Sequence, residues 1–321
     1  MSALLEVKHL KKYFPVPKGI LHAVDDVSLK LDEGKTLGIV GESGCGKSTL
    51  GKTILRLTEP TAGEILFEGK SIEKLSSSQM TAMRQDMQMI FQDPYGSLNP
   101  RMSVSEIIAE PLDIFHLVKD KEERQKRVSE LMEMAGLAKR LTNTYPHELD
   151  GGRRQRIGIA RALAVDPKFI VCDEPVSALD VSIQAQILNL LQDLQKERGL
   201  AYMFITHDMS VVKHISNEIC VMYLGQVVEL CETKQLFKET WHPYTKALLS
   251  AIPVPSLHNR REKILLKGEL VSPINPAPGC RFAPRCPYAT ERCRKENPAL
   301  RELKNGHKVA CHRVEELEKI Q

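Results

Sequence analysis

Apolar residues alternate with polar ones, or gather in short runs, at several points in the first part of this chain of 321 residues. Residues 3–9 and 23–31 predict strands, and residues 37–40 form an apolar run typical of a buried strand. Two further strands are expected at residues 64–69, which end in a turn signal, and at residues 87–91. The beginning of the chain therefore predicts a sheet.

The pattern becomes helical between about residues 100 and 165. Apolar residues recur there at intervals of three and four, as they do on the buried face of an amphipathic helix. A run of mixed charge from residue 119 to residue 127 is typical of a solvated helix face. This block predicts a helical insertion into the sheet domain.

Strands and helices alternate again after residue 165. Strands are expected at residues 169–172, 201–205 and 218–222, and helices at residues 183–197 and 209–215. Alternation of this kind indicates an α/β fold, with a mostly parallel sheet covered by helices on both faces.

A glycine-rich turn separates the apolar run 37–40 from a helical pattern. Residues 41–48 match the phosphate-binding loop G-x-x-x-x-G-K-[ST] without a gap. Its glycines let the backbone direct N–H groups at a phosphate, at a helix N-terminus that favours an anion. Lys47 is expected to reach the β- and γ-phosphates, and Ser48 to offer a hydroxyl to Mg²⁺. The candidate nucleotide-binding residues here are Gly41, Glu42, Ser43, Gly44, Cys45, Gly46, Lys47, Ser48 and Thr49.

The overall composition disfavours one class of partner. Charged residues make up 27% of the chain but the formal net charge is only +4, so nucleic acid is not an expected partner. The N-terminus lacks a secretory signal, and no run approaches the roughly 18 apolar residues that a membrane-spanning helix needs. We therefore expect a cytosolic protein that reaches a membrane only through a partner.

The eight cysteines are expected to be thiols or metal ligands, because disulfides are rare in a reducing compartment. Cys172, Cys220 and Cys231 lie in apolar strands and predict core residues. Cys45 lies beside a helix N-terminus, where the pKa of a thiol tends to fall. We therefore expect alkylation of Cys45 to block nucleotide binding, and bound nucleotide to protect the thiol.

An acidic pair follows the apolar strand at 169–172. Asp173 can hold the shell of a Mg²⁺ ion, while Glu174 can polarise an attacking water. Such a pair is common on its own. Together with an upstream phosphate-binding loop, it is specific for nucleotide hydrolysis.

Four further motifs make the chain resemble the ATP-binding cassette (ABC) family over most of residues 5–252. Gln92 in Phe-Gln-Asp-Pro is similar to the Q-loop glutamine, and residues 149–156 are similar to the signature sequence. Asp180 in Ser-Ala-Leu-Asp is similar to the D-loop aspartate, and His207 to the switch histidine.

This resemblance implies a RecA-like core with an inserted helical subdomain at about residues 93–165. It implies that Gln92 senses Mg²⁺ and the attacking water near the docking surface of a transmembrane partner, and that His207 contacts the γ-phosphate. Tyr13 or Phe14 is expected to stack on adenine, with Phe14 the better fit. The expected catalytic residues are Lys47, Gln92, Glu174 and His207, and the expected Mg²⁺ ligands are Ser48, Gln92 and Asp173. Cassettes of this family pair head to tail, so a second cassette is an expected partner.

The signature departs from the usual Leu-Ser-Gly-Gly-Gln, because Asp150 replaces serine and Arg153 replaces glutamine. A carboxylate cannot donate a hydrogen bond to a partner-bound γ-phosphate, and two unit charges about 4 Å apart interact by roughly 4 kcal/mol at an effective dielectric near 20. Asp150 is equally a good N-cap for a helix that begins at Gly151. Two interpretations stay open: a weakened composite ATP site at Asp150, Gly151 and Gly152, or a tolerated cap.

The composition shifts toward proline and cysteine beyond residue 252, so we expect a nucleotide-binding domain at 1–252 and an extension at 253–321. Four cysteines of the extension have the spacing C-x₅-C-x₆-C-x₁₇-C: Cys280, Cys286, Cys293 and Cys311. Structural zinc usually has closer pairs, whereas four loop thiolates can hold a [4Fe–4S] cluster. Zinc and unmetallated thiols remain alternatives.

This extension, with residues 145–148 and 242–249, narrows the resemblance to ATPase subunits of bacterial and archaeal importers of oligopeptides and dipeptides. The resemblance implies a [4Fe–4S] cluster in at least some members. His307 and His312 are candidate substitute ligands but are more typical of surface residues.

The sequence therefore predicts an ATPase that energises peptide import at the cytoplasmic face of a membrane. The expected partners are a second, different cassette, two permease subunits and, indirectly, an extracytoplasmic binding protein. The alternatives are an importer of nickel or another small solute, a cassette ATPase acting on nucleic acid or ribosomes, and a redox-responsive regulator.

Overall fold

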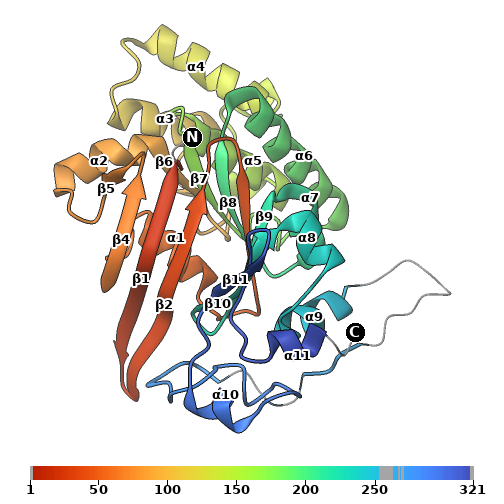
Figure 1. Ribbon diagram of the computed structural model, residues 1–321. Helices are drawn as coiled ribbons and strands as arrows, with labels where there is room; N and C mark the ends of the chain where they lie inside the picture. The colour runs from red at the N-terminus through yellow and green to blue at the C-terminus, as the bar shows by residue number, and fades with distance from the viewer. Residues whose placement is uncertain (1–2, 253–262, 267, 269–270, 319–321) are drawn as a thin grey trace. The chain divides into compact units, whose positions relative to one another are not determined.

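The computed structural model describes residues 3–252, 263–266, 268 and 271–318 (Figure 1). The chain forms two compact units. Unit 1 consists of Met1–Leu31, Thr36–Glu73 and Thr206–Gln321, and unit 2 consists of Asp32–Lys35 and Lys74–Ile205. Both units combine strands with helices, so the predicted α/β fold class is confirmed.

Unit 1 contains a four-stranded antiparallel sheet in the order β2-β1-β4-β5. Its strands are β1 Leu5–Val16, β2 Gly19–Leu31, β4 Ala62–Phe67 and β5 Lys70–Ser71. β1 and β2 are longer than the segments predicted at 3–9 and 23–31, because they continue into a hairpin in which Val16 pairs with Gly19. That hairpin is half-exposed, so it lacks a clear apolar pattern.

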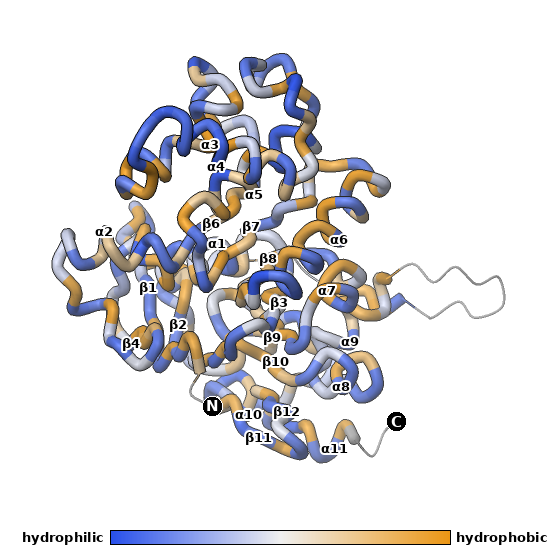
Figure 2. Tube along the Cα trace, turned by 90° about the horizontal axis from the view of Figure 1, so that it is seen from above, coloured by the Kyte–Doolittle hydropathy of each residue, from blue (hydrophilic) through white to orange (hydrophobic). Residues whose placement is uncertain are grey.

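A second set of strands in unit 1 has the order β11-β12-β10-β9-β3. β3 Thr36–Val40 pairs in parallel with β9 Glu218–Tyr223, which pairs antiparallel with β10 Gln226–Glu232. β3 and β9 are almost entirely buried, and the apolar residues of β9 are orange in Figure 2. Strands buried on both faces form continuous apolar runs, so the sequence predicted both correctly.

The described part of the extension adds two strands to this set. β12 His307–Val309 pairs antiparallel with β10, and β11 Arg301–Lys304 pairs with β12. Trp241, Val309 and Val314 form a small buried cluster beside them. The compact units thus divide the chain differently from the predicted segments 1–252 and 253–321, whose boundary stays a prediction.

The expectation that His307 lies at the surface is wrong. His307 and Glu229 are both fully buried, and Nε2 of His307 lies 2.8 Å from Oε1 of Glu229. The backbone N–H groups of Trp241 and His242 also donate to Glu229. A buried carboxylate needs such partners, and their distance along the chain hid this network from the sequence pattern.

The helices of unit 1 are short. They are α1 Lys47–Ile54, α7 Met209–Ile215, α8 Thr233–Lys238, α9 Pro243–Ser250, α10 Glu291–Lys295 and α11 Val314–Glu318. The sequence predicted α1 and α7. α8, α10 and α11 have six, five and five residues, too few to produce a helical apolar pattern, and α9 was not predicted although it is as long as α1.

Unit 2 has a parallel set of strands in the order β8-β7-β6. The strands are β6 Met87–Ile90, β7 Phe169–Asp173 and β8 Ala201–Thr206, whose last residue is assigned to unit 1. The helices are α2 Ser77–Asp86, α3 Val104–Ile114, α4 Lys121–Met134, α5 Gly151–Leu163 and α6 Val181–Arg198, with single turns at Lys139–Leu141 and Pro146–Glu148. The expected helical block at 100–165 corresponds to α3, α4 and α5.

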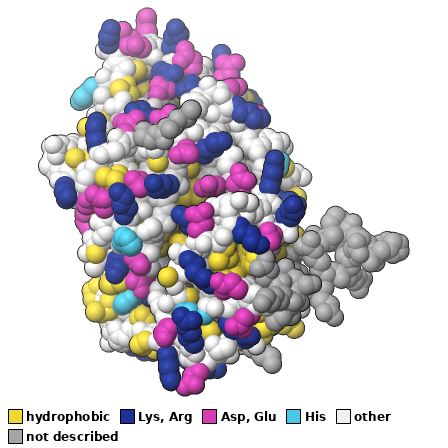
Figure 3. Space-filling model, viewed as in Figure 1, with side chains coloured by type: hydrophobic (Ala, Val, Ile, Leu, Met, Phe, Trp, Pro, Cys, Tyr) yellow, Lys and Arg dark blue, Asp and Glu magenta, His cyan; other side chains and the backbone are white. Residues whose placement is uncertain are grey.

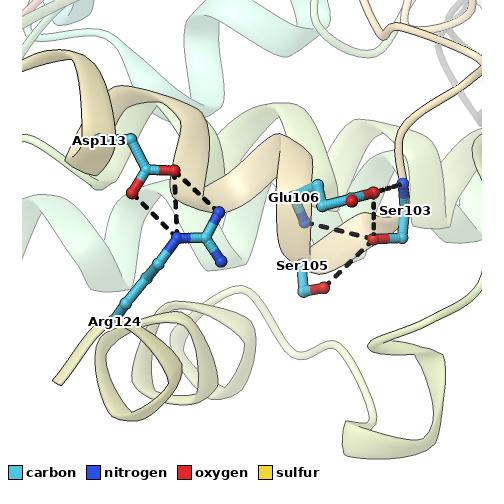
Figure 4. A network of polar contacts seen from close by, with 5 residues as sticks. All are labelled: Ser103, Ser105, Glu106, Asp113 and Arg124. Carbon is cyan, nitrogen blue, oxygen red and sulfur yellow. Dashed lines mark hydrogen bonds and ion pairs between the residues drawn. The ribbon is translucent and has the colours of Figure 1, made fainter. Parts of the chain in front are cut away.

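Local polar contacts fix the start of this helical block (Figure 4). Ser103 and Glu106 form a capping box at the N-terminus of α3, in which each side chain accepts the other residue's backbone N–H. Arg124 of α4 forms an ion pair at 2.8 Å with Asp113 of α3. The mixed charge that the sequence assigned to a solvated face therefore also joins two helices.

Candidate functional site

The phosphate-binding loop lies in unit 1 between β3 and α1. Gly41 and Gly46 have φ angles of 156° and 102°, values that residues with a side chain rarely adopt. A Cβ atom on Gly46 would lie 2.0 Å from the carbonyl oxygen of Ala23, and one on Gly41 would lie 2.2 Å from that of Met222. Both glycines are therefore required for backbone conformation and for space.

Lys47 lies over this loop with only 4% of its surface exposed. Its ammonium donates to the carbonyl oxygens of Gly41 and Glu42, at 2.8 and 3.0 Å. The N-cap of α1 is Gly46, which has no side chain to occupy the first-turn N–H groups. A nearly buried cation and a helix N-terminus thus lie together, an arrangement that favours phosphate.

The predicted fall in the pKa of Cys45 is wrong. The thiol is 1% exposed, and burial raises its pKa, outweighing the opposite influence of the neighbouring Lys47. Cys172, Cys220 and Cys231 are buried in strands, which confirms them as core residues. The loop context suggested a reactive thiol, but burial decides its chemistry.

Cys45 is therefore expected to resist alkylation at neutral pH. Burial raises its pKa above the ordinary range of a cysteine thiol, so little thiolate forms at pH 7, and the labelling rate rises only at more alkaline pH. Mass spectrometry of iodoacetamide-treated protein, native and urea-unfolded, measures this difference. Equal labelling rates for Cys45 in both states at pH 7 would contradict it.

The acidic pair and Gln92 come together within unit 2. Asp173 ends β7 and is 3% exposed. The side-chain amide of Gln92 donates to Oε2 of Glu174 at 3.1 Å. Glu174 has a φ angle of 44°, and its N–H donates to the carbonyl oxygen of Ile205 at 2.9 Å. A left-handed backbone at a non-glycine residue is strained, and such strain is common at functional sites.

His207 lies in unit 1, between the end of β8 and the start of α7. Its side chain is exposed, and the next residue, Asp208, caps α7 by accepting the N–H of Ser210 at 2.7 Å. Asp208 also donates its own N–H to the hydroxyl of Thr206 at 3.1 Å. These bonds fix the backbone on both sides of the histidine.

The signature residues and Asp180 pack together in unit 2. Asp150 caps α5 by accepting the N–H of Arg153 at 2.8 Å, and the Arg153 guanidinium lies 3.4 Å from its carboxylate. A Cβ atom on Gly152 would lie 2.7 Å from the side chain of Ile183, whose own N–H donates to Asp180 at 3.0 Å. Asp150 is thus an N-cap whose charge is partly offset by Arg153.

The two adenine candidates have different surroundings. The ring of Tyr13 stacks on His22, with centroids 3.9 Å apart, and its hydroxyl donates to Asp25. Burial and then this hydrogen bond raise the pKa of Tyr13. Phe14 has the ammonium of Lys12 4.7 Å from its ring centroid. Of the two rings, Tyr13 is thus fixed both by stacking on His22 and by the bond from its hydroxyl to Asp25. The choice of Phe14 over Tyr13 stays a prediction.

The four cysteines of the extension line one cavity in unit 1. Burial, followed by the charge of the neighbouring thiols, raises the pKa of Cys280 and of Cys311 to about 11. Among the described residues, no group of three His, Cys, Asp or Glu side chains is arranged to hold a single metal ion. All four cysteines line that cavity, and cysteine thiolates are the ligands that an iron–sulfur cluster takes. His312 also lines the cavity and donates to the carbonyl oxygen of Glu296 at 2.9 Å.

Comparisons with known proteins agree with these motifs. Residues 24–177 match the model of the family described as ABC transporter, and residues 228–293 match the oligopeptide/dipeptide transporter C-terminal region. The putative oligopeptide transport ATP-binding protein YkfD of Bacillus subtilis is 54% identical, over 96% of this chain and 95% of its own length. The chain belongs to the ABC transporter family.

Other members of the ABC family support this assignment. The oligopeptide transport ATP-binding protein OppF of Haemophilus influenzae is 53% identical, over 97% of each chain. Among solved structures, the ATP-binding cassette MJ0796, bound to ADP and Pi in a dimeric post-hydrolysis state, is 33% identical with a TM-score of 0.67. That likeness covers 71% of this chain and 98% of the cassette.

The sequence did not predict that residues near the end of the chain bind the phosphate-binding loop and its neighbours. Glu42 of the loop binds Tyr244 and Arg285, and Asp25 binds Arg281. These three partners follow the loop by some 200 residues or more. Arg281 and Arg285 each adjoin a cysteine, and this adjacency was the one available signal.

Proposed function

We propose that this chain hydrolyses ATP and thereby drives the import of oligopeptides or dipeptides through a membrane permease. The observation that carries the proposal is similarity to oligopeptide transport ATP-binding proteins along nearly the whole chain. The complete phosphate-binding loop and the contact between Gln92 and Glu174 supply the corresponding chemistry.

Each candidate residue has a role in this proposal. Lys47 exchanges its bonds to loop carbonyls for bonds to phosphate oxygens, and the N–H groups of the loop and of α1 bind the same phosphates. Glu174 orients and polarises the attacking water, Gln92 holds the Glu174 carboxylate, and His207 donates to the γ-phosphate. Tyr13 or Phe14 stacks on the adenine.

Mg²⁺ suits the oxygen donors of this chain. Ser48, Gln92 and Asp173 would hold the ion, which would offset phosphate charge. Hydroxyl, amide and carboxylate oxygens are its preferred ligands, so the donor set fits.

The extension supplies the proposed second cofactor. Cys280, Cys286, Cys293 and Cys311, which line one cavity, would hold a [4Fe–4S] cluster through their thiolates. Protein purified without oxygen is expected to absorb near 400 nm and to contain iron. A colourless, iron-free preparation with bound zinc, or with neither metal, would contradict this assignment.

The working form proposed here contains a second cassette, since a similar solved cassette is dimeric. The signature of this chain, with Asp150, Gly151 and Gly152, then faces the nucleotide of the partner, and Asp180 lies at the same surface. We propose a different chain as the partner, because Asp150 lacks the hydroxyl that the usual serine donates.

Asp150→Ser is expected to accelerate hydrolysis at the partner's ATP. Arg153 offsets part of the carboxylate charge, so the gain is limited to about tenfold, which corresponds to ~1.4 kcal/mol. Single-turnover hydrolysis, assigned to each site by inactivating the phosphate-binding loop of this chain or of the partner in turn, measures the change. Equal rates at both sites, unchanged by the substitution, would mean that Asp150 is only a cap.

The proposed location is the cytoplasmic face of a membrane. None of the described helices is long and apolar enough to cross a bilayer. On the face drawn in Figure 3, basic and acidic side chains are interspersed. Attachment would therefore come through two permease subunits, while a binding protein outside the membrane delivers the peptide.

Co-purification tests this proposal. Tagged protein extracted from membranes with mild detergent is expected to carry two hydrophobic permease subunits and a second cassette. Recovery with ribosomes or nucleic acid, in place of permease subunits, would contradict it.

A further inference from the structure

Arg285 of the extension reaches the phosphate-binding loop. Its guanidinium donates to both carboxylate oxygens of Glu42, at 2.6 and 3.0 Å. The side chains of Arg285 and Glu42 are only 10% and 29% exposed. A two-bond pair of this kind is geometrically specific, and its partial burial reduces screening by salt.

Glu42 is held at its backbone as well. The hydroxyl of Tyr244 accepts the N–H of Glu42 at 2.8 Å, and the carbonyl oxygen of Glu42 accepts a bond from Lys47 at 3.0 Å. The second residue of the loop is thus fixed at its side chain, its N–H and its carbonyl group. Two of these three contacts come from beyond residue 240.

The turn that carries Arg285 packs against Tyr223 and Tyr244 through Phe282. Phe282 is 1% exposed, and its ring centroid lies 5.2 Å from that of Tyr223 and 5.5 Å from that of Tyr244. The turn is therefore in contact with the tyrosine that binds Glu42. Packing and charge therefore connect it to the same loop residue.

Arg281, in the same turn, binds a residue that in turn binds the adenine candidate Tyr13. It donates to the carbonyl oxygen of Leu224 and to the carboxylate of Asp25, which accepts the hydroxyl of Tyr13. Its side chain is 6% exposed. Arg281 follows Cys280 and Arg285 precedes Cys286, so both arginines lie between two cysteines that line the cavity.

We propose that Arg285 is a positioning residue for the phosphate-binding loop, acting through Glu42. Together with Arg281, it makes nucleotide affinity depend on the turn at residues 280–286. The inference rests on the proposed function only in that the loop binds ATP. Arg285 itself touches no nucleotide and takes no part in hydrolysis.

The decisive comparison is a cycle of Arg285→Gln, Glu42→Gln and the double variant in the full-length protein. Each single variant is expected to weaken binding of a fluorescent ATP analogue by about tenfold, as expected for a charge-assisted pair. The double variant is expected to lose no more than either single one, since both remove the same interaction. The KM for ATP rises with the dissociation constant, while kcat changes by less than about twofold.

Two further variants separate positioning from general destabilisation. Arg285→Lys keeps one charged contact and is expected to recover part of the affinity. Arg292→Gln is the matched control, because Arg292 also adjoins a cysteine and forms an ion pair at 2.9 Å with Glu296, but both side chains are exposed. Its ATP affinity is expected to equal that of the unchanged protein, and the melting temperature of each variant without nucleotide reports its folding.

Lys47→Met distinguishes the failure of this inference from failure of the proposed function. Unchanged affinity in both Glu42→Gln and Arg285→Gln, with binding lost in Lys47→Met, would overturn the role of Arg285 and leave ATP binding intact. Additive losses in the double variant would also overturn it. Unchanged affinity in Lys47→Met would instead contradict the proposed function.

Discussion

Glu174→Gln lowers ATP turnover by about 10²- to 10³-fold, the expected result if this carboxylate is the general base. The substitution keeps the shape of the side chain but removes its charge, so the attacking water is no longer polarised. ATP affinity is expected to change little, because Glu174 acts on water and not on the phosphates. Steady-state phosphate release, measured beside binding of a fluorescent ATP analogue, gives both quantities.

Glu197→Gln is the control for Glu174→Gln. Glu197 lies on α6 in the same unit and is exposed, so its substitution makes the same chemical change away from the acidic pair. Turnover that falls equally in both variants, or stays unchanged in Glu174→Gln, would show that Glu174 is not the base.

Lys47→Met is expected to weaken ATP binding by about 10²-fold or more, because a nearly buried ammonium contacts phosphate with little screening by water. Methionine keeps most of the apolar stem, so the loop retains its packing. The bonds from the ammonium to Gly41 and Glu42 are lost, which makes the loop itself less rigid. Equilibrium binding of the same ATP analogue measures the effect.

Lys52→Met provides the comparison for that loss. Lys52 lies in the last turn of the same short helix, α1, away from the N-terminus that receives phosphate. Its substitution is expected to leave ATP affinity within about twofold of the unchanged protein. Equal losses in Lys47→Met and Lys52→Met would point to a general effect of removing positive charge.

The sequence correctly predicted those parts of the fold in which the local environment of each residue determines its type. β3, β7, β8 and β9 are buried strands, so their apolar runs are continuous, and α6 is long enough to show a helical period. The phosphate-binding loop was recognisable because backbone geometry requires glycine at Gly41 and Gly46. Local sequence was sufficient where the local environment determines the residue type.

The errors concern contacts between residues far apart in the chain. His307 was expected at the surface, but it pairs with Glu229, 78 positions earlier. The pKa of Cys45 was expected to fall, but the fold buries the thiol. Glu42 was predicted only as a loop residue, and its pair with Arg285 spans 243 positions. Periodicity and motif spacing contain no information about such pairs.

Transport in proteoliposomes tests the central claim most directly. The chain is reconstituted with the permease and second cassette that co-purify with it, and uptake of a labelled oligopeptide is measured with and without ATP, in the presence of the binding protein. The account predicts uptake that requires ATP and that is lost in Glu174→Gln. Uptake that proceeds equally without ATP, or that persists unchanged with the Glu174→Gln chain, would contradict it.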